Sequence, residues 1–576
     1  MKQNFKTLLI FGFFLLFPLL ARSAEIEFNV DPSYDYAGRS KVNAFLNQVG
    51  DNAYFYVESE YYNNLGIDQK KEFIENIRNL SQEFDENIYP KLREIFGSEW
   101  NPGIDKDPKI TILFTRIKGE SGGYFNSGDE YPKIQSVDSN EREIIYLNSD
   151  YANKSLIRGF LAHEFTHLIT FNQKEKTRQV EEDIWLNEAR AEMAIALLGY
   201  DQAYSGSNLQ RRIRAFLQKI SDPLGEWKNE SSDYGVANVF TQYLVDRYGM
   251  RILSDSLKSG KIGIPSLNEA LENNGFADDF SQIFTDWSVA VLVNDCSVLQ
   301  KYCYSNENLK NLRIIPQLNY LPSAGESTLT LLNYAKNWQG NWYKFIGGQG
   351  TLKLDFVGDQ KVKFKVPYVL EDSSGKYTVG FLELDASQRA ANYFSDFGKK
   401  IKSITLIPSV QSKMSGFGEI EPYYQFIVTA SIINETAEKK EQDELVGNLL
   451  LQIAFLEKEI ASLQARITAI LASRGKTLTT NNSAIACGIL EDDLYYGIKD
   501  SKDVGCLQEF LKKQGPEIYP EGLVTGNFFS STKAAIIRFQ EKYGAEILAP
   551  LGLNKGTGYV GQRTLAKINQ LKSYPR

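Results

Sequence analysis

Residues 157–169 read IRGFLAHEFTHLI, and this run contains both histidines of the 576-residue chain, His163 and His167. Its apolar residues recur at helical spacing, so we expect one helix that carries the two imidazoles on the same face. Imidazoles placed in this way can chelate one metal ion, with Glu164 beside them as a general base toward water. Chance placement of the two histidines, with an acid after the first, gives this spacing about once in two thousand sequences. The alternative is a pair of structural histidines, or a site that has lost its activity.

The third metal ligand must be a carboxylate, because a catalytic zinc site needs three protein ligands and the chain has no further histidine. Glu188 follows His167 by 21 residues and lies in the helical segment WLNEARAEMA at 185–194. We predict Glu188 as this ligand. Glu192 falls one turn further along the same face. With Asn187, it is expected to orient the ligand side chains by contacting them on the side away from the metal.

HEFTH followed by WLNEARAEMA resembles the gluzincin zinc metallopeptidases, and within them the hyicolysin-like family with its HExxH and WLNE pattern. The resemblance covers roughly residues 25–310 and includes the segment 233–249, which is similar to the helix after the active site. It implies a zincin-like fold, one zinc ion on His163, His167 and Glu188, and peptide-bond hydrolysis. Family members often have Gly where this chain has Ala189, a departure that leaves the ligands intact.

A tyrosine is expected to stabilise the oxyanion, because some gluzincins use a third histidine for this purpose and this chain has none. Tyr234 is the predicted residue. The alternative is an ordinary packed tyrosine among the 32 of the chain.

Strands come first and helices afterwards in residues 24–315, which favours an α+β domain. Residues 109–117 and 143–147 have the pattern of buried strands. Between them lies a glycine-punctuated strand that could form a sheet edge. Its residues Gly123, Tyr124 and Phe125 are expected to hold an extended polypeptide substrate by β-augmentation.

Residues 316–434 differ in character, with short strands separated by Gly, Asp and Ser turns. This spacing is typical of a β-sandwich. No titratable cluster stands out in this stretch, so we expect a structural or substrate-positioning module.

The N-terminus has the pattern of a signal peptide at residues 1–23. Lys2 and Lys6 precede an apolar run at 8–20, and small residues follow up to position 23. The alternative, an uncleaved anchor, would need roughly 20 apolar residues. We therefore expect a secreted protein, or one held at the cell surface or cell wall.

The four cysteines fall into two local pairs, Cys296 with Cys303 and Cys487 with Cys506. Two disulfides are expected in an oxidising compartment, since the C-x-x-C spacings of a four-thiolate zinc site are missing. The net charge of −8 and the pI near 5.3 argue against nucleic acid as a partner.

A heptad run at 436–474 predicts a coiled coil, because its apolar residues alternate spacings of three and four. The apolar seam from Val446 to Ile470 spans three and a half heptads. This length suits weak self-association, folding back on a neighbouring domain, or a stiff spacer.

Residues 485–576 contain an internal repeat, in which 525–536 align with 557–568. Each copy has a glycine turn, an apolar plug and a threonine at a helix start. The stretch is similar to the peptidoglycan-binding domain type 1, a three-helix module, although Phe529 replaces a glycine of its turn. The resemblance implies a wall-binding module; a generic protein-docking bundle is the alternative.

Together these features predict a multidomain, exported zinc metalloendopeptidase that is tethered to the cell wall and acts on polypeptides. Two alternatives remain: a hydrolase of peptidoglycan cross-link peptides, and an inactive wall-binding adhesin. Many zinc enzymes that cut peptidoglycan cross-link peptides use more histidines than this chain has.

Overall fold

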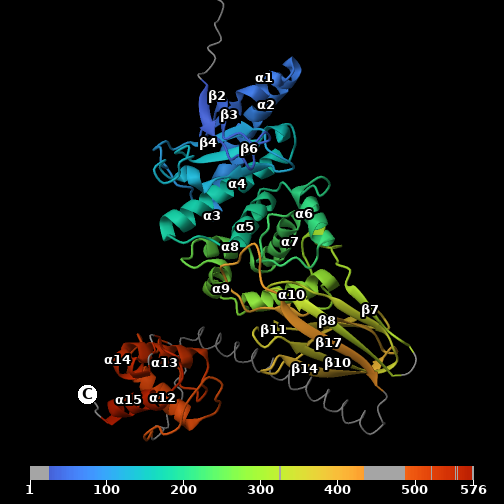
Figure 1. The fold of residues 1–576 in the computed structure, drawn as a ribbon, viewed down its shortest axis with the longest axis vertical. Coiled ribbons are helices and arrows are strands. Elements are labelled where there is room, and N and C mark those ends of the chain that lie inside the picture. The colour runs from blue at the N-terminus through green and yellow to red at the C-terminus, as the bar shows by residue number, and fades with distance from the viewer. Residues whose placement is uncertain are drawn as a thin grey trace, which may run out of the picture. The chain divides into compact units, whose positions relative to one another are not determined.

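The computed structural model falls into two compact units, Met1–Gly447 and Asn448–Arg576 (Figure 1). It describes residues 25–323, 326–433, 487–520, 522–551, 553 and 555–573. The predicted signal peptide at 1–23 and the predicted coiled coil at 436–474 lie outside the described residues. Within the described part, every helix is too short or too polar to cross a membrane.

A six-stranded sheet opens the described part of the first unit, in the order β1-β2-β3-β4-β6-β5. β3, β4 and β6 are parallel, and β5 runs antiparallel to β6 at one edge. β4 and β6 are buried along their whole length because apolar clusters cover both faces of the sheet. The strands are Ile26–Asn29 (β1), Lys41–Val49 (β2), Ala53–Glu58 (β3), Ile110–Thr115 (β4), Gly123–Phe125 (β5) and Ile144–Asn148 (β6).

Helices α4 to α10 follow the sheet, as the sequence pattern predicted, whereas α1, α2 and α3 lie between β3 and β4. α4 contacts β5 and β6 on one side and α3 and α5 on the other, which explains why its sequence is apolar all round. The α-helices are Ser59–Asn64 (α1), Ile67–Glu83 (α2), Tyr89–Phe96 (α3), Ile157–Phe171 (α4), Ile184–Leu197 (α5), Asn208–Gln218 (α6), Ser231–Tyr248 (α7), Arg251–Leu257 (α8), Gly263–Asn273 (α9) and Phe280–Val293 (α10). Short π- or 3₁₀-helical turns lie at Phe84–Ile88, Ser127–Glu130, Ser149–Tyr151, Asn172–Lys176, Gln300–Tyr302 and Glu307–Leu309.

The β-rich stretch forms two mainly antiparallel layers that share a core, with β7 and β9 paired in parallel. β13, β12, β15, β9 and β7 make one layer, and β14, β10, β17 and β8 make the other. A single residue pair, Phe397 with Ile401, joins them. This is the arrangement that the sandwich interpretation requires. The strands are Gln317–Leu321 (β7), Ser327–Ala335 (β8), Tyr343–Gly347 (β9), Gly350–Gly358 (β10), Phe364–Lys365 (β11), Pro367–Asp372 (β12), Tyr377–Phe381 (β13), Arg389–Phe397 (β14), Ile401–Leu406 (β15), Ser409–Val410 (β16) and Tyr424–Ile433 (β17).

This β-module packs tightly against the helical layer. Trp338 and Trp342 enter the hydrophobic core of the helices, where Trp342 Nε1 donates to the Ser288 carbonyl at 2.8 Å. The Gly416 amide donates to Asp183, the residue before α5, at 2.8 Å. The stretches 24–315 and 316–434 therefore share one compact unit.

The second unit is built on the predicted repeat. Its helices are Lys502–Lys513 (α12), Ser530–Lys542 (α13), Gly544–Ile547 (α14) and Gln562–Ser573 (α15), with a 3₁₀ turn at Ala549–Leu551. α13 and α15 are the helices of the two aligned copies, and a buried glutamine precedes each copy, Gln508 on α12 and Gln540 on α13.

The two glutamines make the same hydrogen bonds, one repeat apart. Each Oε1 accepts two successive backbone amides, and each Nε2 donates to a carbonyl and to a threonine hydroxyl. The partners of Gln508 are Thr525, Gly526, Asn527 and Thr532, and those of Gln540 are Thr557, Gly558, Tyr559 and Thr564. Both predicted disulfides are formed, Cys296 with Cys303 and Cys487 with Cys506.

Candidate metal centre

Helices α4 and α5 bring the three predicted ligands together. One ligand atom from each of His163, His167 and Glu188 lies within 4.8 Å of the others. Glu188 Oε2 is 3.1 Å from His163 Nε2 and 3.6 Å from His167 Nε2. The helical spacing of the histidines makes this possible, because it aims both rings at the same face of α5.

Polar side chains behind the imidazoles fix their orientation. Glu192 Oε1 lies 3.5 Å from His163 Nδ1, and Asn187 Oδ1 lies 3.0 Å from His167 Nδ1. With each Nδ1 occupied, each Nε2 is directed toward Glu188. Glu192 and Asn187 thus lie beside the two imidazoles, and their role in orienting the metal ligands stays a prediction.

Glu192 is itself held by residues that the sequence interpretation missed. Arg212 on α6 donates to both of its oxygens, at 2.9 and 2.5 Å. The side-chain amides of Asn208 on α6 and Asn238 on α7 donate to Glu192 Oε2, at 2.8 and 3.1 Å. Burial alone would raise the pKa of Glu192, but Arg212 lowers it and keeps the carboxylate ionised. These partners lie in no recognisable motif.

The ligand atoms suit a divalent cation. Among the described residues, no hydrogen bond reaches the buried Glu188 Oε2. Burial by itself would raise the pKa of Glu188, yet His167 and His163 hold it well below its usual range. Burial would lower the pKa of His167, but Glu188 and Glu164 raise it to about 9. Two imidazole nitrogens and a carboxylate oxygen are a donor set that zinc accepts, so the residues present fit this metal.

Glu164 points from α4 toward strand β5. Burial raises its pKa, while the two histidines act to lower it. A Cβ at Gly123 would lie 3.1 Å from Glu164 Cγ and 2.6 Å from the Tyr146 carbonyl oxygen. The absence of a side chain at Gly123 therefore allows the strand to pass directly beside this carboxylate.

β5 is an edge strand, as the sequence predicted. The Asn148 amide on β6 donates to the Gly122 carbonyl at 2.9 Å. Because backbone groups alternate along a strand, those of Gly123 and Phe125 face the free edge. The Tyr124 side chain points elsewhere, since its ring stacks between those of Tyr34 and Tyr146.

Two tyrosines line the cleft beside the ligands. Tyr234, the predicted one, donates to Asn229 Oδ1 at 2.8 Å, and its ring centre lies 6.5 Å from that of His163. Tyr34 lies in the same cleft, a cavity of about 440 Å³. Burial, followed by the charges of Glu164 and Glu188, raises the pKa of Tyr34. The sequence interpretation missed Tyr34, because it occurs in a turn before the second strand with no motif around it.

Similarity to known proteins adds to this geometry. Residues 500–568 match the family model described as a putative peptidoglycan binding domain. The chain is also 29% identical over 226 residues to the neutral metalloprotease ShpI of Staphylococcus hyicus, which covers 34% of this chain and 47% of that protein. The chain thus spans about half the length of this curated relative. The resemblances to a metallopeptidase and to a peptidoglycan-binding domain are both confirmed.

Two solved structures were also matched. The pre-peptidase C-terminal domain of a Bacillus anthracis collagenase is 11% identical, with a TM-score of 0.14, over 20% of this chain and 96% of that one. A GH115 4-O-methyl-α-glucuronidase is 9% identical, with a TM-score of 0.13, over 57% of this chain and 52% of that one. At these TM-scores neither match bears on the fold.

Proposed function

We propose that this protein is an exported zinc-dependent endopeptidase of the gluzincin type, with a zincin-like catalytic domain and a C-terminal unit that binds the cell wall. The observation that carries the proposal is the convergence of His163, His167 and Glu188 beside Glu164 and the free edge of β5. A metal site, a carboxylate base and a surface for an extended peptide then lie in one cleft.

The chemistry of the site follows from its residues. A zinc ion there would polarise the substrate carbonyl and lower the pKa of water. Glu164 is the buried carboxylate beside this position, so it takes the proton from water and delivers it to the leaving amine. Glu192 and Asn187 hold the imidazoles in the orientation that leaves each Nε2 available to the metal.

Substrate and oxyanion are held by the walls of the cleft. The outward backbone groups of Gly123 and Phe125 pair with an extended polypeptide, which fixes the scissile bond next to Glu164. The Tyr34 hydroxyl is a donor for the developing oxyanion, because it lines the cleft and burial raises its pKa. Tyr234 lines the same cleft and donates to the oxyanion only when its hydroxyl leaves Asn229 Oδ1.

The C-terminal unit would hold the protein at the cell wall. Its match to a peptidoglycan-binding domain supports attachment to the wall, and the predicted signal peptide supplies the export that this requires. The predicted coiled coil at 436–474 would act as the spacer between head and wall, or as a site of weak self-association. The same match favours the second candidate function, hydrolysis of peptidoglycan cross-link peptides.

Glu164→Gln tests the proposal. Zinc content is measured for wild type and variant, and both are assayed on a denatured protein and on purified cell wall. We expect one zinc per chain in both proteins and cleavage of the denatured protein by the wild type alone. Equal activity of the two proteins would overturn the mechanism. Cleavage of wall peptides without cleavage of protein would favour the second candidate. Zinc-free, inactive wild type that still binds wall would identify an adhesin.

A further inference from the structure

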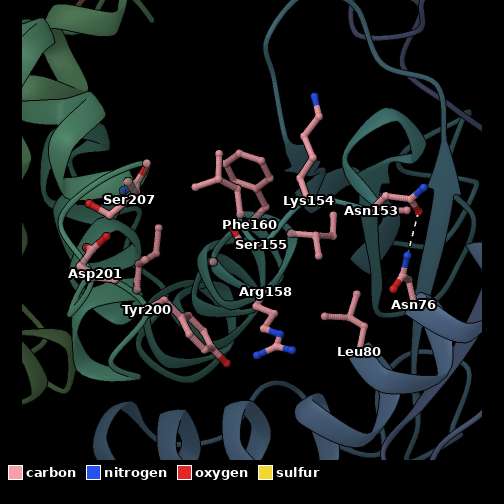
Figure 2. A pocket seen from close by; sticks show the side chains of 18 of the residues that line it. Asn76, Leu80, Asn153, Lys154, Ser155, Arg158, Phe160, Tyr200, Asp201 and Ser207 are labelled. Carbon is pink, nitrogen blue, oxygen red and sulfur yellow. Dashed lines mark hydrogen bonds between the residues drawn. The ribbon is translucent and has the colours of Figure 1, made fainter. Parts of the chain in front are cut away.

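A second cavity adjoins the metal cleft. Its volume is about 420 Å³, and it lies between α2, the start of α4 and the loop from α5 to α6 (Figure 2). Phe160, Ile195 and Asn208 line both this cavity and the metal cleft. Phe160 precedes the ligand His163 by one turn of α4, so the shared wall lies close to the point where a peptide bond would be cut.

Two neighbouring arginines on α6 differ in a way that points to a ligand. Arg212 is paired with a carboxylate, because it donates two hydrogen bonds to Glu192. Arg211 lines the metal cleft with no carboxylate within 4.0 Å among the described residues, and its buried Nε finds no hydrogen-bond partner there. Its only described side-chain hydrogen bond goes to Asn208 Oδ1, at 2.9 Å. Burial, followed by the charge of Arg212, lowers the pKa of Arg211.

Arg211 is held at the junction of the two cavities. Its guanidinium lies 5.3 Å from the ring centre of Phe160, the wall that both cavities share. Stacking of this kind fixes the plane of a guanidinium while leaving its N–H groups free for a planar acceptor. Arg211 is therefore ready to receive a carboxylate entering from the metal cleft.

The side chains that line the second cavity carry a net positive charge. Figure 2 shows Lys154 and Arg158 at its rim, and among the residues that the structure describes neither forms an ion pair. Asp201 is the acid that lines it; burial raises the Asp201 pKa to about 6. The rest of the polar lining is neutral and includes Asn76, which donates to Asn153 at 2.9 Å.

We propose that the two cavities form one substrate channel and that a carboxylate of the polypeptide binds on the metal-cleft side of their shared wall, with Arg211 as the residue that selects it. The inference rests on the proposed peptidase function and names its substrate class: polypeptides with Asp or Glu close to the scissile bond. The terminal carboxylate of a peptide has the same chemistry, so the test must separate the two sources.

Matched peptides test the selection. The zinc-loaded full-length protein is assayed on peptides with amidated C-termini that carry Glu or Gln at each position around the cleaved bond. At one position we expect kcat/KM for Glu to exceed that for Gln by about tenfold, the discrimination that one charge-assisted hydrogen bond gives. A parallel pair with free or amidated C-termini reports on the terminal carboxylate; an advantage of the free form alone would assign the pocket to chain ends and overturn side-chain selection.

Variants of the same helix assign the effect to Arg211. Arg211→Gln should abolish the Glu/Gln ratio, and Arg211→Lys, which keeps the charge, should keep part of it. Arg214→Gln changes an exposed arginine of α6 and should leave the ratio unchanged. Thermal melting of each variant checks that it is folded. A Glu/Gln ratio near one in the wild type, or one that survives Arg211→Gln, would overturn the inference.

A binding measurement separates this inference from the proposed function. Titration calorimetry on full-length Glu164→Gln reports the Kd of the Glu and Gln peptides without turnover. A tenfold tighter Kd for Glu supports selection by Arg211 even where wild type cleaves nothing, a result that would overturn the peptidase proposal alone. Active wild type with equal Kd values would overturn the selection and leave the peptidase proposal standing.

Discussion

Both units contain buried polar side chains that hold neighbouring segments together, but these side chains are charged in the first unit and neutral in the second. In the first unit, ionised Glu192 is compensated by a charged arginine and by amides from two other helices, up to 46 residues away. In the second unit, Gln508 and Gln540 are neutral and find all their partners 17 to 24 residues along the chain. A metal site needs fixed charges, which are costly to bury and must be paired, whereas a docking module can be held together by neutral amides.

Breaking the ion pair of Glu192 with Arg212 should have the largest effect on the unfolding free energy. Glu192→Gln leaves Arg212 buried without a carboxylate, and we expect a loss of about 3–5 kcal/mol in the unfolding free energy of the first unit. Calorimetry of the full chain should show the first unit melting earlier and the second unchanged. Glu60→Gln, which breaks the pairing of Arg39 with an acid whose side chain is 60% exposed, is the matched control and should cost less than about 1 kcal/mol. Equal effects of the two variants would contradict the difference between the units.

The disulfides come next. Replacing Cys487 and Cys506 together by alanine opens a loop with a separation of 19 residues, which should cost the second unit about 3 kcal/mol. The same change at Cys296 and Cys303, separated by 7 residues, should cost the first unit about 2.5 kcal/mol. Denaturant unfolding measures both. A larger loss in the first unit would contradict the expected increase of the loss with loop length.

The paired glutamines test the repeat. Gln508→Ala and Gln540→Ala each leave two partly or fully buried backbone amides without an acceptor, so each should lower the unfolding free energy of the second unit by about 2 kcal/mol. The exposed Gln562 is the control, and Gln562→Ala should change little. Strongly unequal losses would mean that the two copies are equivalent in geometry but not in energy.

The smallest effect should come from Asp183, whose pKa burial raises to about 6. Since the unfolded chain releases this proton near pH 4, the wild type loses unfolding free energy as pH rises from about 4 to about 6. Asp183→Asn keeps the acceptor for the Gly416 amide and avoids this loss. We expect the variant to be about 1 kcal/mol more stable than wild type at pH 7 and no more stable at pH 4, by thermal melting. The opposite order would show that the ionised form of Asp183 is stabilising.

Much of the candidate site follows from local spacing. Positions four apart on α4 fix the two imidazoles on one face, and the lack of any further histidine leaves a carboxylate such as Glu188 as the third ligand. The repeat of the second unit was visible in the same way, because its two copies carry matching glycine turns and threonines. The role of Gln508 and Gln540 appeared only in the structure. Periodicity also predicted β4, the edge strand β5 and β6.

Partners drawn from distant elements could not be predicted. Arg212, Asn238 and Tyr34 reach the site only when α6, α7 and an N-terminal turn pack around α4 and α5. The same holds for the β-module, which the sequence separates from the helices but whose Trp338 and Trp342 complete their core.

By itself, the sequence predicted the candidate ligand set, the edge strand and the repeat, because each rests on side-chain directions or turn residues within short stretches of chain. Tertiary structure alone decided which of two adjacent arginines of the metal cleft is paired with a carboxylate and which is not. Arg211 and Arg212 have the same chemistry, and helix geometry rotates successive side chains by about 100°. Which partner each arginine contacts depends on the apolar packing between helices. This packing brings Glu192 to Arg212 and leaves Arg211 in the metal cleft without a carboxylate partner among the described residues.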